Sequence, residues 1–316
     1  MGAGLRFGAQ SDSRSRASTD DLHSRIPAQA NPQALYGKVR VILNSIELVI
    51  ITDLDGTLLD QQTYSYQASL PMLRRLQSSR IPLVLCSSKT RSEMEPLWRE
   101  LELKDPFIVE NGGAIFFLPD YFPFTVENAK VRGNFHILEL SQRIDVLRPA
   151  LLEAAQNHHV SIRSFGEMTI QEISQMTGLS RKNAQAASER EYDEPFMVRQ
   201  INYGRLFTAL RTKGFKITQG DRFFHLSRGS DKGKATQKLI ELYQRVNPSV
   251  RSVGLGNAGH DLAMLRVVNT PILVRNPDRS WDSTITQNLA GIKKTMKIGP
   301  EGWSEAVAEI LKAGAC

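Results

Sequence analysis

The segment ELVIITDLDGTLLD, residues 47–60, constrains the fold of this chain more than any other feature. Its apolar run at 48–51 is typical of a buried parallel strand, and two aspartates spaced by one residue follow it, Asp53 and Asp55. Because side chains alternate along a strand, both carboxylates can face the same side at its carboxyl end, where open α/β sheets bind ligands. Adjacent carboxylates repel each other unless a cation lies between them. We therefore predict a Mg²⁺ site beside a nucleophile and a proton-transfer group.

Apolar patterns further along the chain repeat the alternation of strand and helix. Leucines at helical spacing occupy 70–76, an apolar run ends at Cys86, an amphipathic helix is indicated at 94–101, and 106–117 is typical of two strands around a glycine turn. This order favours an α/β fold with a doubly wound parallel sheet.

The pattern changes after residue 130, where helices mix with hairpins, and the strand–helix order returns at Lys232. We therefore expect a core formed by residues 46–130 and 221–316, with a small α+β domain, 131–220, inserted into it. Residues 1–45 are rich in Ser, Arg, Gln, Ala and Gly and lack apolar periodicity, so they are predicted to be a disordered extension.

Composition narrows the class of partner. The net charge is +7, but the basic residues are scattered instead of forming a stripe with interleaved aromatics, so we expect no nucleic-acid partner. No apolar stretch reaches membrane-spanning length. The two cysteines, Cys86 and Cys316, imply no disulfide framework, which suits a reducing cytoplasm. A small anionic substrate is compatible with this balance, although an ordinary solvated surface also explains it.

Two further residues have the chemistry that phosphoryl transfer needs. Ser87 directly follows the second strand, where its hydroxyl could hold a phosphate oxygen, although a serine there could equally cap the next helix. Lys232, in GSDKGKAT, could neutralise both an aspartate nucleophile and a bound phosphate. A solvated lysine is the alternative interpretation, and Lys234 is a rival of the same type.

Four positions along the chain together resemble the motifs of the haloacid dehalogenase (HAD) superfamily, whose members are mostly aspartate-nucleophile phosphatases. They are DLDGT, Ser87, Lys232 and GLGNAGHDLAML. The last motif departs from the usual GDxxND pattern. Asn257 replaces the first acid and His260 replaces the later asparagine, while Asp261 is retained. An amide oxygen can still ligate Mg²⁺ with one negative charge fewer, and Asp261 is the other candidate ligand. We interpret His260 as a surface or supporting residue, since imidazole suits Mg²⁺ poorly.

A closer resemblance covers residues 47–316. The segments LCSSKTRSEM, ENGGAIF, MTGLS, EREYDEPF, GDRFFHL and DKGKA are similar to those of the mannosyl-3-phosphoglycerate phosphatase family. This resemblance implies a Rossmann-like core with an α+β cap of the C2B type. It also implies Mg²⁺-dependent hydrolysis of mannosyl-3-phosphoglycerate to mannosylglycerate, a compatible solute, and some members accept the glucosyl analogue.

The resemblance also implies roles for individual residues. Asp53 would form an aspartyl-phosphate, Asp55 would act as general acid and then as base, and Ser87 and Lys232 would bind the phosphoryl group. Mg²⁺ would be held by Asp53, the main-chain carbonyl of Asp55, Asn257 and Asp261. The candidates for binding the rest of the substrate, including its carboxylate, are Ser88, Lys89, Asn111, Gly112, Gly113 and Arg190, whose alternative roles are solvated charges and turn formation.

Two alternatives stay open. One is another capped HAD phosphatase, acting on glucosyl-3-phosphoglycerate, sucrose phosphate or trehalose phosphate. The other is a non-catalytic binding protein whose metal site is impaired by Asn257. The oligomeric state is not predicted.

Overall fold

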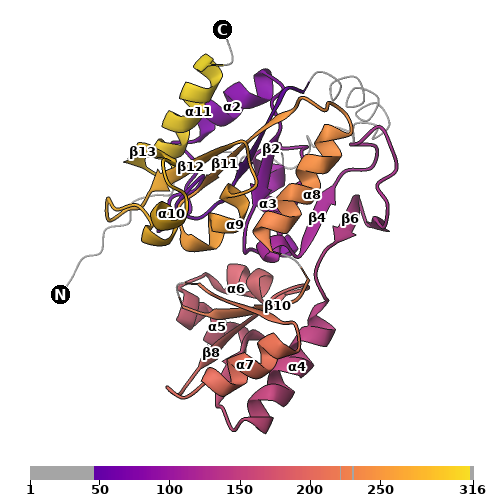
Figure 1. Ribbon diagram of the computed structural model, residues 1–316, viewed down its shortest axis with the longest axis vertical. Coiled ribbons are helices and arrows are strands. Elements are labelled where there is room, and N and C mark those ends of the chain that lie inside the picture. The colour runs from indigo at the N-terminus through magenta and orange to yellow at the C-terminus, as the bar shows by residue number, and fades with distance from the viewer. Residues whose placement is uncertain (1–45, 221, 230, 314–316) are drawn as a thin grey trace, which may run out of the picture.

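The computed structural model describes residues 46–220, 222–229 and 231–313. The predicted N-terminal extension, residues 1–45, lies outside the described residues. Two units, one above the other in Figure 1, are connected by two crossings of the chain. Within the described ranges no helix combines the length and apolarity that crossing a bilayer requires.

The larger unit is built on a nine-stranded sheet in the order β13-β12-β11-β1-β2-β3-β4-β6-β5. The first six strands in this order are parallel, as expected, whereas β4, β6 and β5 extend the sheet in antiparallel fashion. The strands are β1 (Leu48–Thr52), β2 (Leu83–Cys86), β3 (Phe107–Val109), β4 (Ala114–Phe117), β5 (Lys130–Arg132), β6 (Phe135–Glu139), β11 (Arg251–Gly256), β12 (Thr270–Arg275) and β13 (Lys293–Ile298).

Alternation along the central strand β1 gives the sheet two apolar faces. Ile50 packs into one core cluster together with buried residues of α2, α3 and α11, whereas Val49 and Ile51 pack into a second cluster with residues of α8, α9 and α10. Helices therefore cover both faces of the sheet. Their bounds are α2 (Leu70–Ser78), α3 (Arg91–Glu100), α8 (Lys232–Gln244), α9 (Leu262–Leu265), α10 (Ser283–Asn288) and α11 (Glu301–Ala313).

The smaller unit, residues 144–227, is called the cap below. It contains a four-stranded antiparallel sheet in the order β7-β8-β10-β9, with β7 (Ile162–Ser164), β8 (Glu194–Val198), β9 (Lys216–Gln219) and β10 (Phe224–Ser227). Four helices accompany the sheet: α4 (Ile144–Asn157), α5 (Ile170–Thr177), α6 (Arg181–Ser188) and α7 (Gly204–Thr212). The expected α/β core with an inserted α+β cap is thus confirmed.

Strand pairing corrects both predicted boundaries of the insertion. β6 and all but the first residue of β5 fall within 131–220, yet both strands belong to the core sheet, and β10 falls after 220 but pairs with the cap sheet. The sequence of a short strand does not reveal which sheet the strand joins, because hydrogen bonds to strands distant in the sequence determine the pairing. The cap therefore begins after β6 and ends with β10.

Candidate active site

Asp53 and Lys232 form a buried ion pair at the carboxyl end of β1. Asp53 follows β1 directly, and its backbone N–H donates to the Leu255 carbonyl of the neighbouring strand at 2.9 Å. Lys232 begins α8 and places its Nζ 2.6 Å from Asp53 Oδ1. Both side chains are almost fully buried. Burial alone would raise the pKa of Asp53, but the Lys232 ammonium holds this pKa below its usual range, so Asp53 is ionised at neutral pH.

Asp261 holds the same ammonium from the other side. Its Oδ1 lies 2.7 Å from Lys232 Nζ, and its Oδ2 accepts the backbone N–H groups of Asn257 and Ala258 at 3.1 and 3.3 Å. Burial alone would lower the pKa of Lys232, but Asp261 and Asp53 raise it well above its usual range. Both carboxylate oxygens of Asp261 are thus engaged, and its contacts are those of a group that positions Lys232.

Two hydrogen bonds hold the side-chain amide of Asn257 in place. Its Oδ1 accepts a hydrogen bond from Thr57 Oγ1 at 3.0 Å, and its Nδ2 donates to Asn276 Oδ1 at 2.9 Å. The amide packs against Gly56, whose φ is +76°, and a Cβ there would lie 2.6 Å from Asn257 Nδ2. Glycine is therefore required in the DxDGT turn both by conformation and by space.

Asp55 is paired with Lys89. Lys89 Nζ lies 2.8 Å from Asp55 Oδ2 and 4.9 Å from the centre of the Tyr64 ring. Burial would lower the pKa of Lys89, but Asp55 outweighs it and raises this pKa. Lys89 is expected to bind substrate, but its ammonium is already paired with the Asp55 carboxylate, which would compete with a substrate group.

Two carboxylate oxygens in this site lack partners. Asp53 Oδ2 and Asp55 Oδ1 are buried and have no hydrogen-bond partner among the described residues. Unpaired buried carboxylate oxygens are costly, and hard oxygen donors are the ligands that Mg²⁺ takes in proteins. The ligand atoms of Asp53, Asp261 and His260 also lie within 4.8 Å of one another. The site therefore fits a divalent cation, which Asp53 would hold through its carboxylate and Asp55 through its main-chain carbonyl.

The second strand brings Ser87 and Ser88 to the same edge of the sheet. The Ser87 backbone N–H donates to the Ile108 carbonyl at 3.1 Å, and its carbonyl accepts from the Asn111 N–H at 3.0 Å. Ser87, Ser88 and Asn111 line the same cavity as Asp53 and Asp55, about 560 Å³ in volume. The cap contributes the opposite wall through the end of α5 and the β9–β10 hairpin, with Thr177, Gly178, Thr218, Gln219, Gly220, Arg222, Phe223 and His225.

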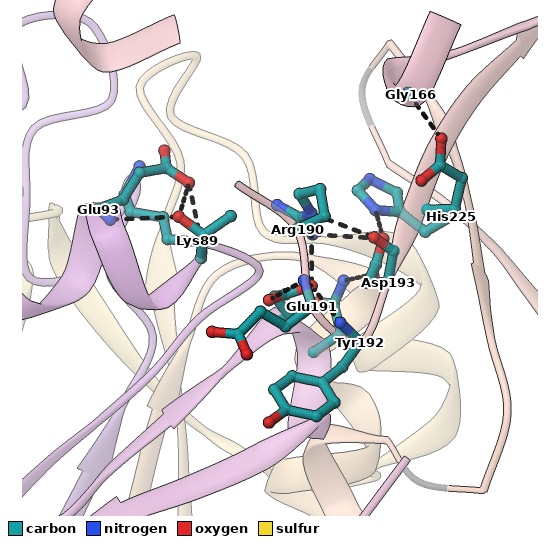
Figure 2. A network of polar contacts seen from close by, with 12 residues as sticks. Lys89, Glu93, Gly166, Arg190, Glu191, Tyr192, Asp193 and His225 are labelled. Atoms are coloured by element: carbon teal, nitrogen blue, oxygen red, sulfur yellow. Dashed lines mark hydrogen bonds and ion pairs between the residues drawn. The ribbon is translucent and has the colours of Figure 1, made fainter. Parts of the chain in front are cut away.

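Arg190 does not line this cavity. Its side chain is 5% exposed, with Nε 3.5 Å from Glu110 Oε2 and Nη2 3.3 Å from Asp193 Oδ1. Glu110 belongs to the core, and Arg190 and Asp193 belong to the cap, so the guanidinium joins the two units. Figure 2 shows the contact between Arg190 and Asp193. These contacts do not support the interpretation of Arg190 as a substrate ligand, because its guanidinium is buried and paired with two acids. The sequence could not show this, since a buried arginine and a solvated one look the same in sequence.

Gly112 packs against backbone atoms and Gly113 against the side chain of Tyr192, and neither glycine lines the cavity. A Cβ on Gly112 would lie 2.2 Å from the Asp231 carbonyl oxygen, and one on Gly113 would lie 2.3 Å from Tyr192 Cβ. These glycines allow the turn to approach both the residue before Lys232 and the cap segment at 190–193. Of the Asn-Gly-Gly turn, only Asn111 reaches the cavity.

Sequence reasoning underestimated two histidines. His260 Nε2 lies 3.5 Å from Asp261 Oδ1 and 3.9 Å from Asp53 Oδ1, so His260 contacts the charged centre. His225 lines the cavity from the cap, in the GDRFFHL segment that carried part of the family resemblance. That segment was a usable signal for His225, whereas only the fold brings His260 close to Asp53.

Comparison with known proteins places this geometry in a family. Residues 50–284 match the family described as haloacid dehalogenase-like hydrolase. The chain belongs to this family. A solved haloacid dehalogenase-like hydrolase from Bacteroides thetaiotaomicron superposes with a TM-score of 0.55 at 19% identity, covering 83% of this chain and 98% of the other, and shows the same fold.

Two relatives are similar in sequence over most of their length. A glucosyl-3-phosphoglycerate/mannosyl-3-phosphoglycerate phosphatase of Methanococcoides burtonii is 37% identical over 265 residues, 83% of this chain and 97% of the relative. A mannosyl-3-phosphoglycerate phosphatase of Pyrococcus furiosus is 37% identical over 250 residues, 79% and 98% of the two chains. This member of the HAD family is a phosphoric monoester hydrolase.

Proposed function

We propose that this HAD phosphatase hydrolyses mannosyl-3-phosphoglycerate to mannosylglycerate and phosphate in a Mg²⁺-dependent reaction, through an aspartyl-phosphate on Asp53. The observation that carries the proposal is the state of Asp53, which lines the cavity: an ionised carboxylate, held at Oδ1 by Lys232, with Oδ2 buried and unpartnered among the described residues. A fixed, ionised carboxylate with one free oxygen is what a nucleophile in phosphoryl transfer requires.

The surrounding residues have contacts that suit the remaining steps. Lys232 is poised to bind a phosphoryl oxygen together with the Ser87 hydroxyl, which lines the same cavity. Asp55 would protonate the leaving glycerate oxygen and then take a proton from the attacking water, using Oδ1, which has no partner among the described residues. Lys89, held at Asp55 Oδ2, would fix the orientation of that carboxylate. Asp53 and the main-chain carbonyl of Asp55 would hold Mg²⁺, whose charge would offset that of the phosphoryl group when it is bound.

The glucosyl analogue is a second candidate substrate. The relative from Methanococcoides burtonii, and one from Persephonella marina that is 37% identical over 267 residues, carry both sugars in their names. Since both sugars would present the same phosphate and glycerate to the site, we expect this chain to accept both. We also place the reaction in the cytoplasm, in keeping with the scarcity of cysteine.

A substrate panel tests the proposal. Phosphate release with Mg²⁺ should give a kcat/KM at least tenfold higher for mannosyl- or glucosyl-3-phosphoglycerate than for sucrose 6-phosphate, trehalose 6-phosphate or simple hexose phosphates, because only the former carry the glycerate carboxylate. Preference for a hexose phosphate would refute the substrate assignment and leave the chemistry at Asp53 intact.

A further inference from the structure

The β9–β10 hairpin carries a segment whose role the proposed reaction does not explain. Arg222 and His225 lie on it and line the cavity that contains Asp53. Among the described residues that line this cavity, Arg222 is the only arginine or lysine. Its Nη1 donates to the Met176 carbonyl at 2.7 Å, which ties the hairpin to the end of α5. A guanidinium has five N–H donors, so this contact orients the group and leaves donors for a ligand.

The imidazole of His225 is oriented by a buried acid. His225 Nδ1 lies 2.8 Å from Asp193 Oδ1, and Asp193 is fully buried, with its Oδ2 accepting from Asn111 Nδ2 at 2.8 Å. Burial would raise the pKa of Asp193, but His225 and Arg190 lower it on balance, so the acid is ionised at neutral pH. The ring is therefore fixed with Nδ1 toward Asp193, as Figure 2 shows, and its Nε2 has no hydrogen-bond partner among the described residues. In the protonated ring Nε2 also carries a hydrogen, so it is the imidazolium form that can donate to a carboxylate.

Among the described residues, no lysine or arginine on the core side of the cavity is available for a second anionic group on the substrate, and the imidazole of His260 faces Asp53 and Asp261. Lys89 is paired with Asp55, Arg190 is buried between Glu110 and Asp193, and Lys232 is enclosed by two carboxylates. The two ends of the cavity are thus chemically different: the core end holds the reacting aspartates and serines, and the cap end holds a guanidinium and an oriented imidazole.

We propose that Arg222 and His225 form a carboxylate-binding subsite on the cap, which takes the glycerate carboxylate while the phosphate lies at Asp53, and that Asp193 is the positioning residue for His225. This inference rests on the proposed function, because it assigns the second anionic group of the same substrate. A cavity of about 560 Å³ falls in the range of small-molecule sites.

Steady-state kinetics on two substrates tests the subsite. Mannosyl-3-phosphoglycerate carries the carboxylate, and p-nitrophenyl phosphate lacks it. Arg222→Gln and His225→Gln should each raise KM for the first substrate about 10- to 100-fold, the usual effect of losing a charge-assisted hydrogen bond, with kcat and the constants for p-nitrophenyl phosphate changed less than about twofold. Arg222→Lys should retain part of the affinity. Asp193→Asn should raise KM for the first substrate alone, by less than His225→Gln.

Matched controls are Arg205→Gln and His158→Gln, exposed cap residues that line a separate cavity and should change neither KM. Thermal unfolding of each variant separates misfolding from lost binding, and Arg222→Lys serves where Arg222→Gln is unstable. Unchanged KM for mannosyl-3-phosphoglycerate, or equal changes for both substrates, would overturn the subsite while leaving the proposed function standing. If the unmodified protein hydrolysed p-nitrophenyl phosphate but not mannosyl-3-phosphoglycerate, the proposed function would fail and the inference with it.

Discussion

At the scale of single residues, two acids of the cavity, Asp53 and Asp55, each combine an ion pair with an unpartnered buried oxygen, and the ion pair of Asp53 is the more deeply buried. Asp53→Asn should abolish turnover, because an amide does not attack phosphorus, while the fold persists through the same backbone contacts. Phosphate release and circular dichroism measure the two effects. Retained turnover in a folded Asp53→Asn protein would exclude the covalent mechanism.

Asn257 is a proposed ligand of the candidate metal site, and its amide carries no formal charge. Asn257→Asp adds one negative charge where Thr57 already donates to the side-chain oxygen, so Mg²⁺ should bind about tenfold more tightly. The gain is limited because Asn276 Oδ1 then faces a carboxylate and its amide must turn over. Calorimetric titration with Mg²⁺ measures the affinity without turnover. Asn202→Asp, next to the other cap cavity, is the matched control, and equal affinities in wild type and Asn257→Asp would show that position 257 lies outside the cation's reach.

The sequence could predict the residues that approach one another at strand ends, since the carboxyl ends of β1 and β2 must meet at one edge. It therefore predicted Asp53, Asp55 and Ser87 as neighbours, and the family resemblance added Lys232. In the structure the first three line one cavity and Lys232 is paired with Asp53. The sequence could not predict which charges are already neutralised. Arg190 and Lys89 are cations in sequence, but the tertiary fold pairs Arg190 with two buried acids and Lys89 with the partly buried Asp55.

At the scale of elements, the turn between β3 and β4 supports the start of α8. Gly112 has φ of +94°, and an added Cβ would lie 2.2 Å from the Asp231 carbonyl oxygen and 2.8 Å from the Lys232 backbone nitrogen. Gly112→Ala should therefore cost about 1–3 kcal/mol of stability and also displace Lys232, reducing kcat by about 100-fold.

Gly291→Ala is the control for that substitution. Gly291 also has positive φ, at +74°, but open space surrounds the position of its Cβ, so alanine should cost about 1 kcal/mol of stability without affecting kcat. Urea unfolding and steady-state kinetics on both variants separate strain from displacement. Equal kcat values in the two variants would show that α8 tolerates a shift of this turn.

Element prediction failed where local pattern and pairing conflict. Strand β13, the sequence KKTMKI, was not predicted, because it lies at an edge of the sheet and carries lysines that suit an exposed edge strand. The strands β5 and β6 were assigned to the wrong unit for a related reason: β5 is exposed throughout, so its pattern does not reveal the sheet it joins.

At the scale of the whole molecule, Asp105 makes stability depend on pH. Burial raises the pKa of Asp105 from 3.8 to about 6, although it accepts hydrogen bonds from the Leu83 N–H and the Tyr121 hydroxyl. Since the folded state holds this proton more tightly than the unfolded chain, its stabilising contribution is complete below about pH 4 and is lost as pH rises through 6. The loss should be about 3 kcal/mol by pH 8.

Asp105→Asn should remove this dependence, since an amide can accept from Leu83 and donate to Tyr121 without titrating. The free energy of urea unfolding, measured from pH 4 to 8, should fall less steeply for Asp105→Asn than for wild type. Asp120→Asn, an exposed position with a left-handed backbone that asparagine tolerates, should retain the wild-type slope. Parallel profiles for wild type and Asp105→Asn would locate the pH dependence elsewhere.

The two segments of the chain that lead into and out of the cap are hydrogen-bonded to each other. The Gln142 N–H and the Ser141 hydroxyl both donate to the Arg228 carbonyl, at 2.8 and 2.7 Å, and Leu140 is bonded in turn to Gly113. The outgoing segment reaches Lys232 only four residues after Arg228. The cap is therefore connected to the ammonium that pairs with Asp53 through one short, hydrogen-bonded stretch of chain, so the position of Lys232 depends on the same segments that carry the cap.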